Sequence, residues 1–446
     1  MNFDGQLEFT FGVLVLIILT LLGYIGLAYT KNHRETLYFQ RKLFLSAVAA
    51  RFGISLILYL FGIAKVIGDD DSNGWIVGTM LRNTWVTQGM GVLDLPTVLL
   101  SVFENTNQGY QYMLGAFFFI TDVPGRFPAA ALNCFFGALI VVLTYRIART
   151  LFSERVAVRA GWVTCLFPSM IIWSAQTVKE PVIILLETVA LYACVKLKNS
   201  GVSIKYIAVC ALALFLVIPF RFYAAYIVGA AVALTLILPH LKQRKLRIGA
   251  VIGLAAIFVP IVFLTGALVR AQAEIERMDL IDRAQTFKTG LTTGNLGTGS
   301  TVKSDFDLRT PSGLIGATAF GGAHLLLAPF PWQLGDGSSL RMLLTLPELL
   351  VWWILFFIGV IPGLWYAIRK RFDEIQPMLI FIAGLGFLYS VLFGNIGLVY
   401  RQRAQLLPWL LIFAMVGLER RFARRRERRQ ARVDEPARPI VVEARS

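Results

Sequence analysis

Apolar stretches of about 20 residues recur along the chain and constrain its fold more than any other feature of the sequence. An α-helix of that length crosses the roughly 30 Å hydrocarbon core of a bilayer. Because lipid offers no hydrogen-bond partners, spanning segments must satisfy their backbone groups internally, so we predict an all-α polytopic membrane protein. The predicted spans, about eleven, are 11–30, 43–66, 127–147, 160–176, 181–197, 205–220, 222–239, 248–269, 346–367, 376–394 and 404–419.

Lysine and arginine are concentrated in short connections that fall on one side of the membrane if the predicted spans alternate. Basic connections are preferentially retained in the cytoplasm. We therefore predict a periplasmic N-terminus and a cytoplasmic C-terminus, with residues 1–420 forming one transmembrane domain and residues 421–446 a basic cytoplasmic tail. The basic connections are 31–42, 146–159, 196–205, 240–247 and 369–371.

The composition supports a membrane protein and argues against a nucleic-acid-binding one. The chain is 57% hydrophobic and 16% charged, whereas soluble domains are near one quarter charged. Its net charge of +16 lies mainly in the short connections and the tail, where orientation and anionic headgroups explain it. We therefore expect the lipid bilayer as a partner and no nucleic acid.

Two connections on the predicted periplasmic side are long, about 68–126 and 270–345. Since most of the chain is committed to spans, we expect these two periplasmic loops to hold the chemistry. Within the first loop, Trp75–Met80 and Tyr110–Ile120 are apolar enough to lie at the membrane interface as amphipathic helices.

Three adjacent carboxylates, Asp69, Asp70 and Asp71, directly follow a predicted span. Adjacent carboxylates repel one another and are costly to dehydrate beside lipid. One of them can act as a general base on an acceptor hydroxyl, and a pair can hold a divalent cation such as Mg²⁺ or Mn²⁺ against a phosphate. We take them as the candidate catalytic residues; a solvated acidic turn or a helix N-cap is the alternative.

Four basic residues are expected at the outward ends of spans, where positive charge needs a counter-charge. A phosphate is the natural partner, because arginine forms paired hydrogen bonds with its oxygens and lysine supplies a point charge. The alternatives are salt bridges to the acidic loop and, at residue 179, an exposed turn whose Pro181 opens the next helix. The candidate phosphate-binding residues are Lys179, Arg221, Arg401 and Arg403.

Four further residues are candidates for substrate binding. Glu180 is placed to orient Lys179 or to help bind a cation, and Glu104 and Tyr110 are placed to line a sugar pocket in the first loop. His324 belongs to the second loop. Within the sequence, no His/Cys cluster has the spacing of metal ligands, so a zinc site is not expected.

Several motifs between about residues 60 and 240 resemble the GT-C superfamily, the polyprenyl-phosphate-sugar-dependent integral membrane glycosyltransferases. Gly68–Asp71 opens the first outward loop, and Asn107–Tyr110 stands where those enzymes often show Gly-Tyr-Pro, although Gln111 replaces the expected proline. The pattern continues with Arg126, Asn133, Tyr145–Arg149, Leu151-Phe152, Pro168, Trp173-Ser174 and Lys179-Glu180, and Pro329–Trp332 and Tyr400–Pro408 add less specific pieces.

The resemblance implies a GT-C-like bundle that transfers a sugar, with inversion, from a lipid monophosphate to a glycan, lipid or protein acceptor at the periplasmic face of a bacterial inner membrane. It maps the base to Asp69, Asp70 or Asp71 and lipid-phosphate binding to Lys179, Arg401 and Arg403. The Asp-Asp-X form of the motif is similar to that of the arabinofuranosyltransferases, among relatives that also include mannosyltransferases, and this similarity implies a pentofuranose donor. An extra span before the acidic loop departs from the pattern.

Two other functions fit a chain with many spans. An O-antigen-type polymerase or ligase also has a long outward loop and outward arginines, but it usually acts without an acidic motif in the first loop. A lipid-glycan flippase or other transporter is the second alternative. The sequence shows no internal repeat of the kind many transporters have, and the long outward loop also favours an enzyme.

Overall fold

The computed structural model describes most of the chain. The described residues are 3–29, 34–63, 70–103, 107–201, 203–237, 252–253, 255–256, 280–292, 302, 306–333 and 346–433. Asp69, Glu104, most of the predicted span 248–269 and the tail beyond residue 433 lie outside them, and for Asp70 and Asp71 only the backbone is described.

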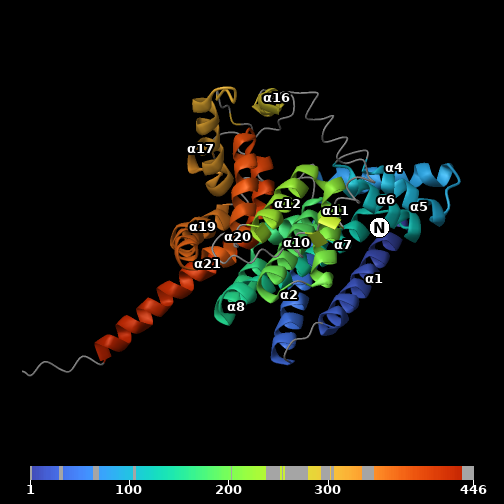
Figure 1. The fold of residues 1–446 in the computed structure, drawn as a ribbon. Helices are drawn as coiled ribbons and strands as arrows, with labels where there is room; N and C mark the ends of the chain where they lie inside the picture. Colours follow the sequence, from blue (N-terminus) through green and yellow to red (C-terminus); the bar gives the residue numbers. More distant parts are fainter. Residues whose placement is uncertain are drawn as a thin grey trace, which may run out of the picture.

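The described residues are almost entirely helical, with no β-strand among them, which confirms the predicted all-α class (Figure 1). The N-terminal half contains α1 (Phe3–Gly26), η1 (Leu27–Tyr29), α2 (Arg34–Leu60), α4 (Asp70–Thr87), η2 (Val92–Asp94), α5 (Leu95–Ser101), α6 (Gly109–Thr121), α7 (Arg126–Leu151), α8 (Glu154–Leu166), α9 (Pro168–Ser174) and α10 (Glu180–Ser200). The remainder contains α11 (Ile204–Phe220), α12 (Phe222–Ile237), α16 (Leu280–Thr292), α17 (Pro311–Leu327), η3 (Pro331–Gln333), α19 (Leu346–Leu355), the π-helix η4 (Phe356–Val360), α20 (Ile361–Val391) and α21 (Ile396–Val433).

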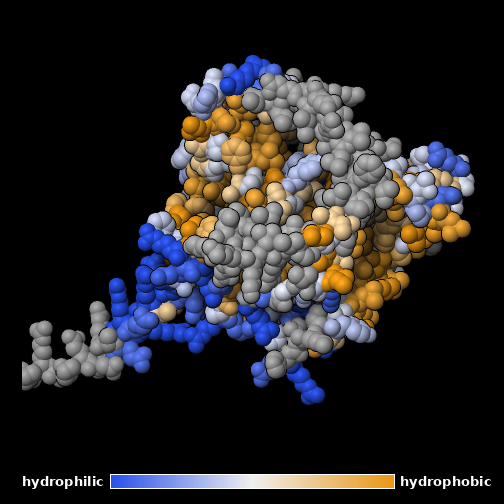
Figure 2. All heavy atoms as spheres, viewed as in Figure 1, coloured by the Kyte–Doolittle hydropathy of each residue, from blue (hydrophilic) through white to orange (hydrophobic). Residues whose placement is uncertain are grey.

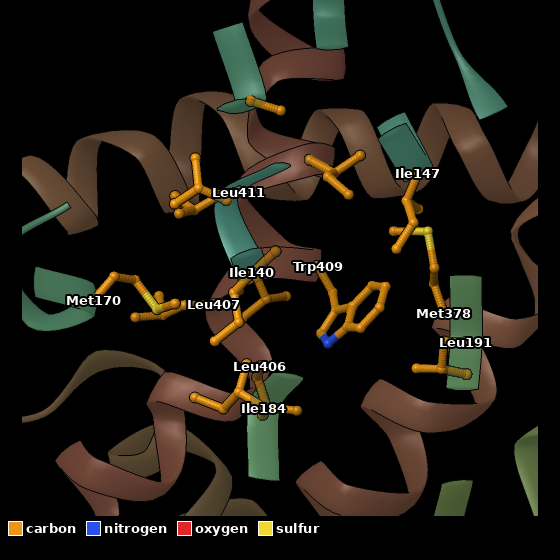
Figure 3. Packing of buried hydrophobic residues seen from close by; sticks show 14 of the residues in the cluster. Ile140, Ile147, Met170, Ile184, Leu191, Met378, Leu406, Leu407, Trp409 and Leu411 are labelled. Atoms are coloured by element: carbon orange, nitrogen blue, oxygen red, sulfur yellow. The ribbon is translucent and has the colours of Figure 1, made fainter. Parts of the chain in front are cut away.

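Two helices organise the packing. Helix α7 packs against α1, α2, α8 and α10, while α21 packs against α8, η4 and α20. Figure 3 shows where α7, α9, α10 and α20 meet α21 around Trp409, whose exposure is 1%. The helices packed on α7 and those packed on α21 therefore share one apolar core.

Four described helical segments are long and apolar enough to cross a membrane, or five if the bent pair α8–α9 forms one span. The chain is thus a multi-pass membrane protein. The four segments are Gly5–Tyr29, Arg34–Leu60, Arg126–Leu151 and Leu346–Val391. The number of spans, about eleven, and the assignment of the two faces to periplasm and cytoplasm stay predictions.

The predicted span 160–176 is broken by a bend of 55° between α8 and α9. Phe167 is extended, with φ −68° and ψ 120°, and Pro168 then opens α9. A proline disfavours helical geometry in the residue before it and lacks the N–H that would continue the helix. The bend therefore follows directly from the sequence Phe167-Pro168.

The predicted connection at 369–371 is a kink at which two helical segments within α20 meet. Arg371 leaves helical geometry there, with φ −140° and ψ 27°. The Arg371 side chain donates to the carbonyl of Leu151 and lies 3.4 Å from a carboxylate oxygen of Glu374. The predicted spans 346–367 and 376–394 are thus joined by a kinked helix.

The surface separates into apolar and polar regions (Figure 2). On the face shown, hydrophobic side chains cover much of the middle, and hydrophilic ones gather at the C-terminal part of α21, at the opposite end near α17, and at the tip near α4 and α5. This division matches a protein whose middle faces hydrocarbon and whose ends face water.

Small residues let α21 approach the α20 segment closely. A Cβ atom at Gly363 would overlap with the carbonyl oxygen of Phe413 and would lie 2.8 Å from the backbone nitrogen of Gly417. A Cβ at Gly417 would in turn overlap with the carbonyl oxygen of Gly359. Closely packed membrane helices commonly use small residues in this way, because backbones can then touch.

We expect Gly363→Ala to reduce the free energy of unfolding by about 1–3 kcal/mol, since the added methyl group overpacks the contact with α21. Gly386→Ala is the matched control on the same helix, because no atom lies within 4 Å of a Cβ there and alanine favours helix. Thermal unfolding of both variants in detergent measures the difference; equal melting temperatures would contradict the close crossing.

Candidate active site

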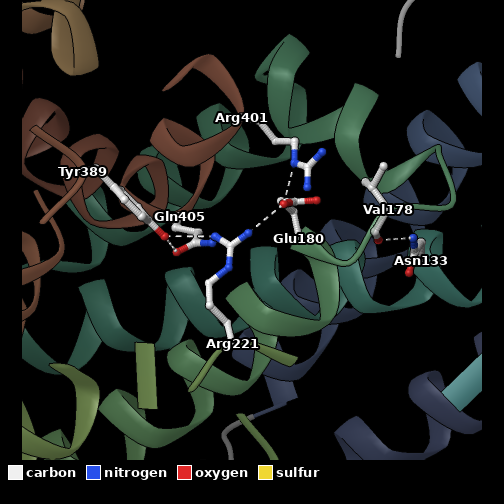
Figure 4. Close-up of polar contacts among 7 residues, drawn as sticks. All are labelled: Asn133, Val178, Glu180, Arg221, Tyr389, Arg401 and Gln405. Carbon is white, nitrogen blue, oxygen red and sulfur yellow. Dashed lines mark hydrogen bonds and ion pairs between the residues drawn. The ribbon is translucent and has the colours of Figure 1, made fainter. Parts of the chain in front are cut away.

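The turn between α9 and α10 is fixed by one side chain of α7. The amide nitrogen of Asn133 donates to the carbonyl oxygens of Gln176 and Val178 at 2.6 and 2.8 Å, and lies 2.9 Å from the Tyr110 hydroxyl of α6. Figure 4 shows the contact with Val178. Asn133 is fully buried. The segment that leads into Lys179 and Glu180 is therefore held to α6 and α7.

Glu180 is the first residue of α10, and its carboxylate is shared by two arginines (Figure 4). Arg401 Nε donates to Glu180 Oε1 at 2.6 Å, and Arg221 Nη2 donates to the same oxygen at 3.1 Å. The Glu180 side chain has 0% exposure, while those of Arg221 and Arg401 have 5% and 15%. Removing these charges from water is costly, so their arrangement depends on their mutual attraction.

Arg221 is held from a second side by α20 and α21. Its Nη1 donates to the Tyr389 hydroxyl at 2.9 Å, and that hydroxyl donates to Gln405 Oε1 at 2.7 Å. Arg221 is the only residue between α11 and α12, so this network joins the α11–α12 junction to α10, α20 and α21. Among the described residues, the second oxygen of Glu180 has no hydrogen-bond partner.

Lys179 adds a further cation beside this network. Burial lowers the pKa of Lys179 to about 8, with a contribution from Arg221, and Glu180 acts in the opposite direction. The described part of the chain gives its ammonium group no ion-pair partner. Two arginines, Arg221 and Arg401, thus contact one carboxylate, and Lys179 interacts electrostatically with Glu180 and Arg221. Such a group of cations is suited to an anion.

Two close backbone approaches bring the first loop to the same region. A Cβ at Gly74 of α4 would overlap with the Thr177 carbonyl and lie 2.7 Å from the Tyr110 ring. A Cβ at Gly109 would lie 2.8 Å from the backbone of Pro219. Since α4 begins at Asp70, one turn before Gly74, the backbone of Asp70 and Asp71 starts beside the turn that carries Lys179.

The two arginines at 401 and 403 do not share a site. Residues two apart on a helix point in nearly opposite directions, and Arg403 donates to the carbonyls of Ala328 and Leu326 at 3.0 and 3.4 Å. Its guanidinium also lies 4.6 Å from the centroid of the Tyr400 ring. Arg403 therefore fastens the end of α17 to α21 and lies apart from the Glu180 cluster.

His324 also lies apart from that cluster. Its ring is 4.4 Å from Phe393 and 4.3 Å from Phe320, and Nδ1 is 2.8 Å from the Phe320 carbonyl. Burial lowers the pKa of His324, which favours the neutral ring. Its surroundings are those of a packed aromatic cluster in the region of α17.

Three contributors to the network were absent from the predicted site: Asn133, Tyr389 and Gln405. In the sequence, only the family pattern marks Asn133. An isolated polar residue inside an apolar span is a functional candidate, and by that signal Gln405 in the span 404–419 was detectable. Tyr389 was not, because a tyrosine in an apolar helix is ordinary.

Within the described residues, no group of three or more His, Cys, Asp or Glu side chains is placed to hold a metal ion. The side chains of Asp69, Asp70 and Asp71 are outside that set. The divalent cation expected beside them is therefore untested and stays a prediction.

We expect Glu180→Gln to destabilise the protein by about 3–5 kcal/mol, because it leaves two buried arginines without their shared counter-charge. The control is Glu374→Gln, which removes a partly exposed i,i+3 partner of Arg371 and should cost at most about 1 kcal/mol. Thermal unfolding in detergent provides the comparison. Equal shifts in melting temperature for the two variants would contradict a special contribution of the Glu180 ion pairs to stability.

A comparison with protein families matches a segment that contains part of the candidate site. Residues 108–263 match the family model described as dolichyl-phosphate-mannose-protein mannosyltransferase. This segment includes Tyr110, Asn133, Lys179, Glu180 and Arg221. No curated protein sequence matches the chain.

Two solved structures are similar in fold. The crystal structure of ArnT from Cupriavidus metallidurans bound to undecaprenyl phosphate shows 15% identity and a TM-score of 0.47, with 84% of this chain and 60% of that chain covered. Archaeal oligosaccharyltransferase AglB from Archaeoglobus fulgidus, in complex with an inhibitory peptide and a dolichol-phosphate, shows 14% identity and a TM-score of 0.44, with 96% and 52% covered. The chain thus spans little more than half the length of either protein.

The predicted resemblance to the GT-C glycosyltransferases is confirmed by the family model: over residues 108–263 this chain is similar to the dolichyl-phosphate-mannose-protein mannosyltransferases.

Proposed function

We propose that this protein transfers a sugar from a polyprenyl-phosphate-linked donor to a glycan, lipid or protein acceptor, with Asp69, Asp70 or Asp71 as general base. The observation that carries the proposal is the pairing of Arg221 and Arg401 with the buried carboxylate of Glu180, beside which Lys179 adds a third cation. We place this site at the periplasmic face of a bacterial inner membrane, in keeping with the distribution of basic connections.

The cations match the charge that develops during the reaction. The acceptor oxygen bonds to the anomeric carbon as the bond from that carbon to the phosphate oxygen breaks, and the electron pair of the broken bond stays on the phosphate. Lys179, Arg221 and Arg401 would stabilise that negative charge, because arginine and lysine form charge-assisted hydrogen bonds with phosphate. The acceptor proton passes to the carboxylate base.

Two residues beside the cations are suited to bind the sugar. Glu180 Oε2 is buried and accepts no hydrogen bond within the described chain, so a sugar hydroxyl could donate to it. Tyr110 is buried at the start of α6, where its hydroxyl meets Asn133. Glu104 belongs to the same proposal as a polar residue just before α6, while Arg403 and His324 are better explained by packing.

The carboxylates of Asp69–Asp71 are also the candidates for holding Mg²⁺ or Mn²⁺ against the donor phosphate. A divalent cation would supply further charge neutralisation at the leaving group. Loss of turnover in EDTA with recovery on adding Mn²⁺ would support this part of the proposal, whereas full turnover in EDTA would assign the neutralisation to the protein's own cations.

The decisive experiment measures transfer of labelled sugar from a panel of polyprenyl-phosphate sugars by purified protein. We expect one of Asp69→Asn, Asp70→Asn and Asp71→Asn to lower turnover by about 10²–10⁴-fold, the usual contribution of a general base. Binding of the donor lipid should persist in that variant, since the amide keeps the size of the side chain.

Asp373→Asn is the matched control and should retain full turnover, because Asp373 lies on α20 more than four helical turns before Tyr389. Transfer that is indifferent to all three first-loop substitutions would overturn the assignment of the base and would favour the O-antigen-type polymerase or ligase. A pentofuranose donor that is used no better than a hexose donor would overturn the expected similarity to arabinofuranosyltransferases.

The protonation state of Lys179 should make the affinity for the donor lipid depend on pH. Its pKa is lowered to about 8, first by burial and then by Arg221, so the ammonium is charged below that pH and neutral above it. We expect the affinity for polyprenyl phosphate to fall above about pH 8 in wild type. Lys179→Arg should flatten this fall, because a guanidinium remains charged; an identical pH profile in both proteins would contradict the role of Lys179.

A further inference from the structure

A cavity of about 560 Å³ lies between the first part of α20 and the C-terminal part of α21. One of its walls is basic, and the other is made by aromatic and aliphatic residues of η4 and α20. The basic wall consists of Arg420, Arg421, Arg424, Arg425 and Arg428.

The basic wall concentrates like charges at helical spacing. Arg420, Arg424 and Arg428 follow one another at intervals of four, an arrangement that destabilises a helix through repulsion. Among the described residues that line the cavity, none is acidic. The nearest carboxylate in sequence, Glu419, is paired with Arg159 and lies 3.7 Å from Arg155. An anion in the cavity would offset this repulsion.

The opposite wall is apolar, and two of its large side chains are exposed. Phe357 and Trp365 are 55% and 59% exposed, and both line the cavity. Tyr366 holds Arg420 in place, with the guanidinium 3.5 Å from the ring centroid. A ligand with a phosphate and adjoining acyl chains fits this combination, because the apolar wall adds nothing to the binding of a free phosphate.

The cavity lies at the other membrane interface from the candidate active site. Arg401 and Arg420 lie on the same helix, α21, and a rise of 1.5 Å per residue separates them by roughly 28 Å. That distance is close to the roughly 30 Å thickness of the hydrocarbon core. The cavity is therefore distinct from the cluster around Glu180.

We propose that this cavity binds the phosphate headgroup of an anionic phospholipid from the leaflet opposite the candidate active site. The arginines of α21 bind the phosphodiester, while Phe357 and Trp365 contact the start of the acyl chains. The lipid thereby fills the space between α20 and the basic extension of α21. This proposal does not depend on the glycosyltransferase activity.

The test is native mass spectrometry of the purified full chain in a neutral detergent, titrated with dioleoyl phosphatidylglycerol or dioleoyl phosphatidylcholine. We expect phosphatidylglycerol to bind wild type more tightly than phosphatidylcholine. The triple variant Arg420→Gln, Arg424→Gln, Arg428→Gln should bind phosphatidylglycerol about 100-fold more weakly, since each basic residue near an anionic lipid contributes about fivefold.

A charge-matched control separates the cavity from the general charge of the tail. Arg426→Gln, Arg429→Gln and Arg432→Gln remove the same charge from the same helix. Arg426 and Arg429 are not among the described residues that line the cavity, and Arg432 lies three positions further along the chain, so affinity should stay within about fivefold of wild type. Equal loss in both triple variants would overturn the proposal and show attraction to the whole tail. Equal binding of phosphatidylcholine would also overturn it.

Two further arms keep the test informative if a triple variant misfolds. Trp365→Ala leaves the charge unchanged and should weaken phosphatidylglycerol binding several-fold by removing part of the apolar wall. Millimolar inorganic phosphate should fail to displace the lipid; displacement, together with unchanged binding in Trp365→Ala, would show that the site takes a soluble anion and would refute a lipid site.

Discussion

The buried carboxylate of Glu180 holds together parts of the chain that are distant in sequence. It accepts hydrogen bonds from Arg221 and Arg401, and Arg221 in turn meets Tyr389. Because an isolated buried charge is strongly destabilising, each of these groups depends on the others being in place. The network therefore fixes α10, α20, α21 and the α11–α12 junction relative to one another, and the same geometry that stabilises the fold gathers cations at one end of the bundle.

Helix α21 combines apolar packing in its middle with charged residues near its ends. Helix α21 enters the core through Trp409 and through close backbone contacts with α20 at Gly363 and Gly417. Such contacts resist deformation, since interiors are close-packed. Helix α21 carries Arg401 near one end and Arg420, Arg424 and Arg428 near the other. The helix between them is about as long as the hydrocarbon core is thick, so α21 connects the two membrane interfaces.

Much of the helix framework followed from the sequence. The length of the apolar stretches predicted the helices, because backbone groups in lipid must form their hydrogen bonds within the chain. Pro168 marks the bend before α9, and Pro181 marks the start of α10. The segments Trp75–Met80 and Tyr110–Ile120 of the first loop, predicted to be helices, lie within α4 and α6, and their position at the membrane interface stays a prediction. The connection expected at 369–371, where three successive basic residues interrupt the apolar pattern, is a kink at Arg371 between two helical segments.

The sequence by itself determined which residues are unusual: charged or polar groups in or beside apolar spans, such as Glu180, Arg221 and Arg401. Only the tertiary structure decided which of them meet, because Arg401 reaches Glu180 across 221 positions of the chain and sequence spacing carries no information on such contacts. It also separated Arg401 from Arg403, which look equivalent in sequence. Two positions on a helix turn the side chains to nearly opposite faces, so one arginine joins the cation cluster and the other holds the end of α17.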